Sequence, residues 1–195
     1  MQIVFLTKHE PQDYIKNGCG EYPDAPIKCP NKDCGFMKEL CKHGYYWRYL
    51  NTEIFLGLIR IRRYLCKKCK HTVSMLPYFC LAKYTNGVEL VVDIMSKAAE
   101  TGSISRVVKI YEGIIGITRK LVKHYLTRLH QNRYHIQYAV NQMSPAPAIM
   151  NWPPGDAEWT RYILLGTGPT LTAEFNAEYH KAMGMSFMST QNRIA

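Results

Sequence analysis

Alternating apolar and polar side chains predict a β-hairpin in the first half of the chain. Residues 45–50 form an aromatic, strand-prone run, and Asn-Thr-Glu at 51–53 can form a turn. In the return segment 54–65, isoleucine and arginine alternate at positions 59–62, which directs the isoleucines to one face and the arginines to the other. The pattern therefore predicts a hairpin with one basic face.

Apolar residues recur at helical spacing in the middle of the chain. The first such segment, 88–100, precedes a Thr-Gly pair, and Ser103 after it is a suitable N-cap for a second helix over 104–111. A glycine-containing turn at 112–116 leads to a third, basic helix over 118–131. This order is the plan of a helix-turn-helix domain, although a plain helical bundle with a charged outer face has the same pattern.

Four of the seven cysteines form two close pairs around the predicted hairpin. Cys29 and Cys34 are one pair, Cys66 and Cys69 are the other, and 31 residues separate the pairs. An odd number of cysteines argues against a closed disulfide framework. Zinc takes four ligands in a tetrahedron, and two tight turns joined by a hairpin supply four thiolates in a zinc ribbon. The spacing therefore predicts one bound Zn²⁺.

Other roles for the cysteines stay open. Cys41, His43 or His71 can replace a ligand or form a second partial site, and Cys19, Cys41 and Cys80 are otherwise structural or free. Buried free cysteines are common in cores, but burial alone does not explain the close pairs. A redox Cys-x-x-Cys pair needs a helix start in a βαβ setting, which the pattern does not indicate.

These patterns divide the chain into four regions and predict an α+β fold. The regions are an N-terminal strand and loop at 1–28, a zinc ribbon at 29–80, a helix-turn-helix domain at 86–135, and a linker with a C-terminal helical segment at 136–195. Within the last region, the Pro-rich stretch 144–157 is predicted to be a linker, and the final helix is expected from about 171 to 183.

The composition indicates a chain that builds a core. It has 195 residues, of which 47% are hydrophobic and 12% aromatic, and this excludes a disordered chain. No apolar run approaches the roughly 20 residues that cross a membrane, and the apolar opening 1–6 is too short for a signal peptide. We therefore expect a cytoplasmic protein without a membrane partner.

The formal net charge of +10 is concentrated in two segments. Residues 38–70 carry +7 and residues 103–135 carry +6, whereas the other three parts of the chain carry −1 each. A surface that serves only solubility spreads its lysines, so two concentrated blocks favour binding to a polyanion. Two ordinary basic faces are the alternative.

The two basic segments predict two contacts with duplex DNA. On the third predicted helix, Arg119, Lys120 and Lys123 are placed to enter the major groove. The hairpin arginines predicted to hold the flanking DNA backbone are Arg48, Arg60 and Arg62.

A second class of function stays open: a zinc-dependent structural module, or one that binds RNA or single strands within a larger assembly. The aromatic residues that could stack on unpaired bases are Tyr45, Tyr46, Trp47 and Tyr49. In the plainer interpretation these four side chains form the core of the hairpin.

The order of the motifs adds a resemblance. The first cysteine pair is followed by His43-Gly44-Tyr45 and the hairpin, then by the second pair, the run Thr-Val-Ser-Met-Leu-Pro at 72–77, and the three helices. This order resembles the N-terminal, DNA-binding half of insertion-sequence transposases. It is more closely similar to a family of small stand-alone bacterial proteins of unknown function, whose endings resemble 186–193 here. The resemblance covers about residues 29–195 and implies DNA binding and association with mobile elements. A second copy of the chain and the transposition machinery stay open as partners.

No catalytic centre is expected. A transposase needs a carboxylate triad on an RNase-H-like domain that holds two metal ions, and residues 136–195 are too few to form that sheet. The segment His-Gln-Asn-Arg-Tyr at 130–134 is similar to a tyrosine-recombinase box, but it lies at the end of the third predicted helix. Gly-Thr-Gly at 166–168 lacks the Lys-Ser/Thr of a phosphate loop. We therefore predict a non-catalytic protein.

Overall fold

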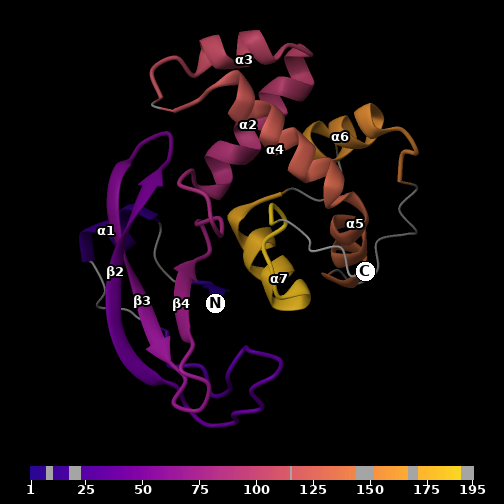
Figure 1. The fold of residues 1–195 in the computed structure, drawn as a ribbon. Helices are drawn as coiled ribbons and strands as arrows, with labels where there is room; N and C mark the ends of the chain where they lie inside the picture. Colours follow the sequence, from indigo (N-terminus) through magenta and orange to yellow (C-terminus); the bar gives the residue numbers. More distant parts are fainter. Residues whose placement is uncertain (8–10, 18–22, 115, 144–151, 167–170, 190–195) are drawn as a thin grey trace.

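The computed structural model describes the chain outside residues 8–10, 18–22, 115, 144–151, 167–170 and 190–195. The described residues form an α+β fold with a four-stranded mixed sheet and seven helices (Figure 1). The strands are β1 (Gln2–Phe5), β2 (Cys41–Asn51), β3 (Leu56–Leu65) and β4 (Thr72–Pro77). The helices are α1 (Pro11–Asn17), α2 (Val88–Thr101), α3 (Ile104–Ile110), α4 (Arg119–Gln131), α5 (Arg133–Met143), α6 (Asp156–Leu165) and α7 (Ala173–Met183). Every helix in this part of the chain is too short or too polar to traverse a membrane.

The sheet is built around the predicted hairpin, which the structure confirms. Its strand order is β1-β4-β3-β2, with antiparallel pairing throughout except that β1 runs parallel to β4. The hairpin turn is closed by Thr52, whose N–H donates to the Phe55 carbonyl at 2.7 Å. A β-bulge interrupts the pairing between Lys42 and Tyr45, where Gly44 has a φ of +73° that favours glycine.

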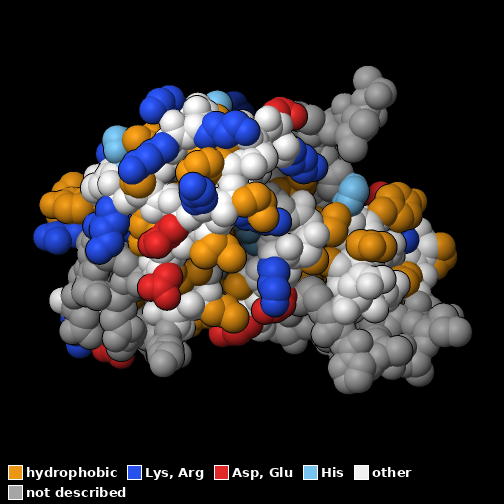
Figure 2. Space-filling model, turned by 90° about the horizontal axis from the view of Figure 1, so that it is seen from below, with side chains coloured by type: hydrophobic (Ala, Val, Ile, Leu, Met, Phe, Trp, Pro, Cys, Tyr) orange, Lys and Arg blue, Asp and Glu red, His pale blue; other side chains and the backbone are white. Residues whose placement is uncertain are grey.

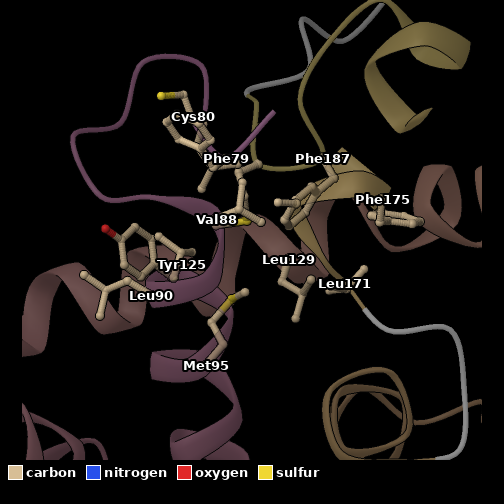
Figure 3. Close-up of a cluster of buried hydrophobic side chains, with 14 of the residues drawn as sticks. Phe79, Cys80, Val88, Leu90, Met95, Tyr125, Leu129, Leu171, Phe175 and Phe187 are labelled. Carbon is tan, nitrogen blue, oxygen red and sulfur yellow. The ribbon is translucent and has the colours of Figure 1, made fainter. Parts of the chain in front are cut away.

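Helices α2 to α7 lie on one side of the sheet, and we call the covered face the inner face (Figure 1). Ile59 and Ile61 are buried there, as the alternation of isoleucine and arginine predicts. They join one continuous core that includes residues from the helices and from the segment after β4. At its centre, Phe79, Val88 and Phe187 converge from distant parts of the chain (Figure 3). The sheet and the helices therefore share a core.

The three helices predicted in the middle of the chain are present, and their ends follow the predicted caps. Helix α2 ends at Gly102, whose φ of +61° lets its N–H donate to the carbonyl four residues earlier. At the start of α3, the Ser103 hydroxyl accepts from the Arg106 N–H. Thr118 caps α4 in the same way through the Leu121 N–H.

Three helices differ from the sequence prediction. Helix α1 occupies a segment predicted to be loop, and it starts with Pro11, a favoured first helical residue. Helix α5 lies before the predicted linker 144–157 and α6 lies mostly after it, although the sequence predicts only one helix after residue 131. The predicted linker 144–157 falls mostly outside the described residues, but its last two residues begin α6. Burial of Trp159 and Ile163 in the core stabilises α6 despite the Pro-Pro-Gly before it.

Buried asparagines join the C-terminal segment to the rest of the core. Asn176 on α7 is fully buried, and its amide donates to the carbonyls of Tyr78 and Cys80. Asn132, between α4 and α5, donates to two carbonyls that follow α7. Because buried backbone carbonyls need such partners, residues 173–189 are integral to the fold.

Candidate metal centre and basic surfaces

Two tight turns place the four predicted cysteines next to one another at one end of the sheet. The first turn carries Cys29 and Cys34 before β2, and the second carries Cys66 and Cys69 between β3 and β4. Their four sulfur atoms all lie within 4.8 Å of one another. The structure therefore brings together the cysteines that the spacing predicted, and they form a possible metal site.

The two turns share one backbone design. In each, the N–H of the first cysteine donates to the carbonyl of the residue two positions after the second cysteine. The Cys29 N–H donates to Phe36 at 2.9 Å, and the Cys66 N–H donates to His71 at 3.0 Å. The two cysteine pairs are therefore held by equivalent hydrogen bonds from opposite sides of the cluster.

The first turn has two more residues between its cysteines than the second turn. Two hydrogen bonds within the first turn accommodate these extra residues. The Cys34 N–H donates to the Asn31 carbonyl at 3.0 Å, and the Asp33 N–H donates to the Asn31 side chain at 3.2 Å. Both turns are then followed by a left-handed residue, Gly35 at φ +61° and Lys70 at φ +59°. Lysine is uncommon in this conformation, and the Lys70 N–H donates to the Cys66 carbonyl at 2.9 Å, which closes the second turn.

The distances between sulfur atoms exclude disulfides and fit a tetrahedral ion. The Sγ atoms of Cys29 and Cys69 are 3.6 Å apart, and so are those of Cys34 and Cys66. A disulfide requires about 2.05 Å. Four thiolates around zinc, each at about 2.3 Å, are separated by about 3.8 Å. All four cysteines are free thiols at a spacing that a metal ion can bridge.

The thiols differ in acidity because their surroundings differ. Burial raises the pKa of Cys29 to about 12 and also raises the pKa of Cys34. At the second turn, the backbone N–H of His71 stabilises the Cys69 thiolate and lowers the pKa of Cys69 to about 6. Cys69 is therefore the more acidic thiol, and Cys29 and Cys34 must lose protons when a cation binds.

The cluster packs on the face of the sheet opposite to the helices, which we call the outer face. Three of the four cysteines are buried in a small second core, together with Tyr64, Val73 and Leu40. The Tyr64 hydroxyl donates to the Pro23 carbonyl at 2.8 Å and so attaches the N-terminal segment to this core. The cysteine turns therefore cover one end of the outer face.

The other cysteine and histidine candidates lie outside the cluster among the described residues. Cys41 and His43 are on β2, and the ring of His71 faces a backbone carbonyl at 3.2 Å. Cys80 is fully buried in the main core, where burial raises its pKa to about 12, so its role is structural. Cys19 lies outside the described residues.

Helix α4 presents the three predicted cations to solvent. Arg119, Lys120 and Lys123 are exposed. Within the described part of the chain, no ion pair joins any of them to a carboxylate. The residues that anchor the opposite side of the helix are Val122, Tyr125 and Leu129. The described residues therefore leave these three positive charges without an ion pair.

The hairpin arginines lie in two different environments. Arg60 is exposed on the outer face, and Arg62 is half-buried on the same face. Arg48 points to the inner face, where its guanidinium donates to the carbonyls of Leu81 and Tyr84. The prediction that Arg48 contacts DNA is therefore corrected, because this side chain holds the segment after β4.

A cleft of about 610 Å³ lies between the hairpin and α4, and no sequence pattern indicated it. Its walls include Tyr49, Leu56, Lys83, Tyr84, Leu121 and Tyr125. Lys83 is exposed at this cleft and has a φ of +68°, which is rare for a residue with a side chain. The hairpin, residues 83–86 and α4 are distant in sequence, and only the tertiary fold brings them together.

Comparisons with protein-family models, with curated proteins and with solved structures give no match.

Proposed function

We propose that this chain is a zinc-stabilised, sequence-specific DNA-binding protein without catalytic activity. The observation that carries the metal assignment is the cluster of four thiols with two 3.6 Å sulfur pairs. Four protein ligands fill a tetrahedral shell, so no position is left for a water or a substrate. Such an ion stabilises a fold, and here it would fix the end of the sheet.

Support for DNA binding comes from α4. Its exposed side carries Arg119, Lys120 and Lys123, which form no ion pair with a carboxylate of the described residues, and a short helix, α3, precedes it across a turn. A helix preceded in this way can enter the major groove with its N-terminal half. There its cations meet phosphates or the acceptor atoms of guanine. On the outer face of the hairpin, we assign the exposed Arg60 and the half-buried Arg62 to the flanking DNA.

Competition binding with duplex DNA, single-stranded DNA and structured RNA tests this proposal. We expect duplex affinity to fall steeply with salt, with a log–log slope of about −4.5 if the five remaining cations each contact one phosphate. Changing Lys120 and Lys123 to Ala should weaken duplex binding and flatten the slope. Lys181→Ala is the matched control, because Lys181 is an exposed helical lysine on α7. Equal losses in the α4 variant and the control would contradict the proposal.

A second candidate, binding to RNA or single strands, is favoured by one observation. Tyr45, Trp47 and Tyr49 are exposed on the outer face instead of forming a hairpin core. In the competition experiment, structured RNA displacing duplex DNA at lower concentration than duplex itself would favour this candidate. The association with mobile elements stays part of the proposal in either case.

A further inference from the structure

The outer face of the hairpin carries aromatic side chains in register with arginines. The cross-strand pairs are Tyr45 with Arg62, Trp47 with Arg60, and Tyr49 with Leu58. Because side chains alternate along a strand, these residues project from the same face. The bulge at Gly44 precedes this row. The sequence between β2 and β3 contributes one acidic residue, Glu53, which lies in the turn.

This row is uncovered. Tyr45, Trp47 and Tyr49 expose 45%, 52% and 57% of their surface, while the cysteine turns reach only the Tyr64 end of the face. Single exposed apolar residues are normal in soluble proteins, but contiguous patches mark interaction sites. In Figure 2, hydrophobic and basic side chains gather together at the left of the view, on the side where Figure 1 places the hairpin.

The combination of a cation and aromatic rings on this face indicates a partner that carries both negative charge and flat apolar groups. The Arg60 guanidinium lies 4.9 Å from the centroid of the Trp47 ring and 5.1 Å from that of Tyr45. This arrangement holds a cation at the centre of an aromatic surface. No described carboxylate forms an ion pair with Arg60. Nucleic acids offer both phosphates for the cation and π-faces for the rings.

The aromatic rings favour an unpaired strand over a duplex. In a duplex the base faces are stacked on one another, and only base edges are accessible in the grooves. Proteins that bind single strands use rings to stack on exposed bases and cations to track the phosphates. Aromatic residues at every second position are spaced by about 6.8 Å along the strand, twice the rise per residue. Successive rings can therefore serve successive bases of an extended strand.

The face continues toward α4. Tyr49 belongs to the exposed row and also lines the 610 Å³ cleft, whose opposite wall includes Leu121 of α4. Lys83 lies at the same cleft and adds a cation between the two surfaces. We propose that the outer face of the hairpin binds an unpaired DNA strand next to the duplex held by α4, so that the protein recognises a duplex–single-strand junction. This proposal rests on the DNA binding proposed above and specifies the form of DNA.

The proposal is tested by fluorescence anisotropy with a blunt duplex, the same duplex with a single-stranded DNA tail, and the tail alone. We expect the wild type to prefer the tailed duplex. Trp47→Ala should reduce this preference about 5- to 150-fold, the loss of stacking on one base, and should lower blunt-duplex affinity far less, because α4 is unchanged. The matched control is Tyr138→Ala, because Tyr138 is 58% exposed on α5 and far along the chain from this face. Trp47→Phe should retain most of the preference, because it keeps an aromatic ring. This result would show that the loss in Trp47→Ala comes from the missing ring and not from a folding defect.

The outcomes separate this proposal from the proposed function. Lack of blunt-duplex binding, together with tail binding that depends on Trp47, would refute duplex recognition by α4 and leave the strand-binding face supported. Duplex binding with no preference for the tail, or a preference that Trp47→Ala and Tyr138→Ala reduce equally, would overturn the strand-binding face. A tail of RNA bound more tightly than the same tail of DNA would overturn the assignment to DNA. Conversion of a dimer into a monomer by Trp47→Ala would show a contact between copies of the chain instead.

Discussion

Replacing Cys66 by Ser tests whether the four thiols bind the metal that stabilises this end of the sheet. Cys66 is fully buried, and its sulfur lies 3.6 Å from that of Cys34. Its N–H donates to the His71 carbonyl, which closes the second turn. Serine keeps the shape of cysteine but is a poor ligand for zinc. The variant therefore removes one ligand with little change in packing.

The expected loss follows from the number of ligands. Structural zinc sites in small folds bind with about 10–16 kcal/mol at neutral pH, so one of four equal thiolates accounts for roughly 2.5–4 kcal/mol. Since 1.4 kcal/mol is a factor of ten, zinc affinity should fall about 60- to 700-fold. The thermal midpoint should fall as well, because metal binding is coupled to folding.

Competition with a zinc indicator measures the affinity, and thermal unfolding with and without a chelator measures the coupling. Cys80→Ser is the control, because Cys80 is also fully buried but lies in the main core, away from the cluster. It should lower the unfolding free energy through its buried hydroxyl and leave zinc affinity unchanged. The metal assignment is refuted if both variants bind zinc like the wild type, or if a chelator leaves the wild-type midpoint unchanged.

Three further predictions follow from the site and its surroundings. Zinc affinity should rise with pH near neutrality by at least about 100-fold per pH unit, because binding must remove protons from Cys29 and Cys34, whose pKa values are raised by burial; an indicator titration with no pH dependence would contradict this. Arg48→Met should lower the unfolding free energy in denaturant titrations by about 2–4 kcal/mol, since two carbonyls lose a charged donor. The same variant should leave the salt slope of DNA binding unchanged, whereas Arg60→Met should flatten it. Labelled DNA should remain intact with Mg²⁺ or Mn²⁺, and metal-dependent cleavage that Asp156→Asn abolishes would disprove the absence of catalysis.

Local chemistry made much of the fold predictable from the sequence. The hairpin follows from the alternation at 59–62, and helices α2 to α4 follow from apolar spacing and from caps such as Ser103 and Thr118. The cysteine cluster was predictable because both members of each pair lie in one tight turn. In each of these cases the residues that determine the structure are close together in sequence.

The features that were missed depend on contacts between distant residues. Helix α6 follows Pro-Pro-Gly, which is typical of a linker, and its stability comes from burial of Trp159. Arg48 differs from Arg60 and Arg62, because strand alternation places its side chain on the face opposite to Trp47, beside the inner-face residues. That signal was present in the sequence. The cleft and the buried role of Asn176 had no sequence signal, since their partners lie far along the chain.

The parallel pairing of β1 with β4 determines the order in which this chain can fold during synthesis. Val4 of β1 can pair only after Leu76 of β4 has been synthesised, so the β1 edge of the sheet forms late. The Tyr84 hydroxyl donates to the Met188 carbonyl, 104 residues later in the chain. Contacts of such long range make folding slow. The four thiols, by contrast, are all available once Cys69 has left the ribosome, long before the core is complete. The first cooperative unit of the nascent chain is therefore expected to be a metal complex, formed while the residues that will cover the sheet are still being made.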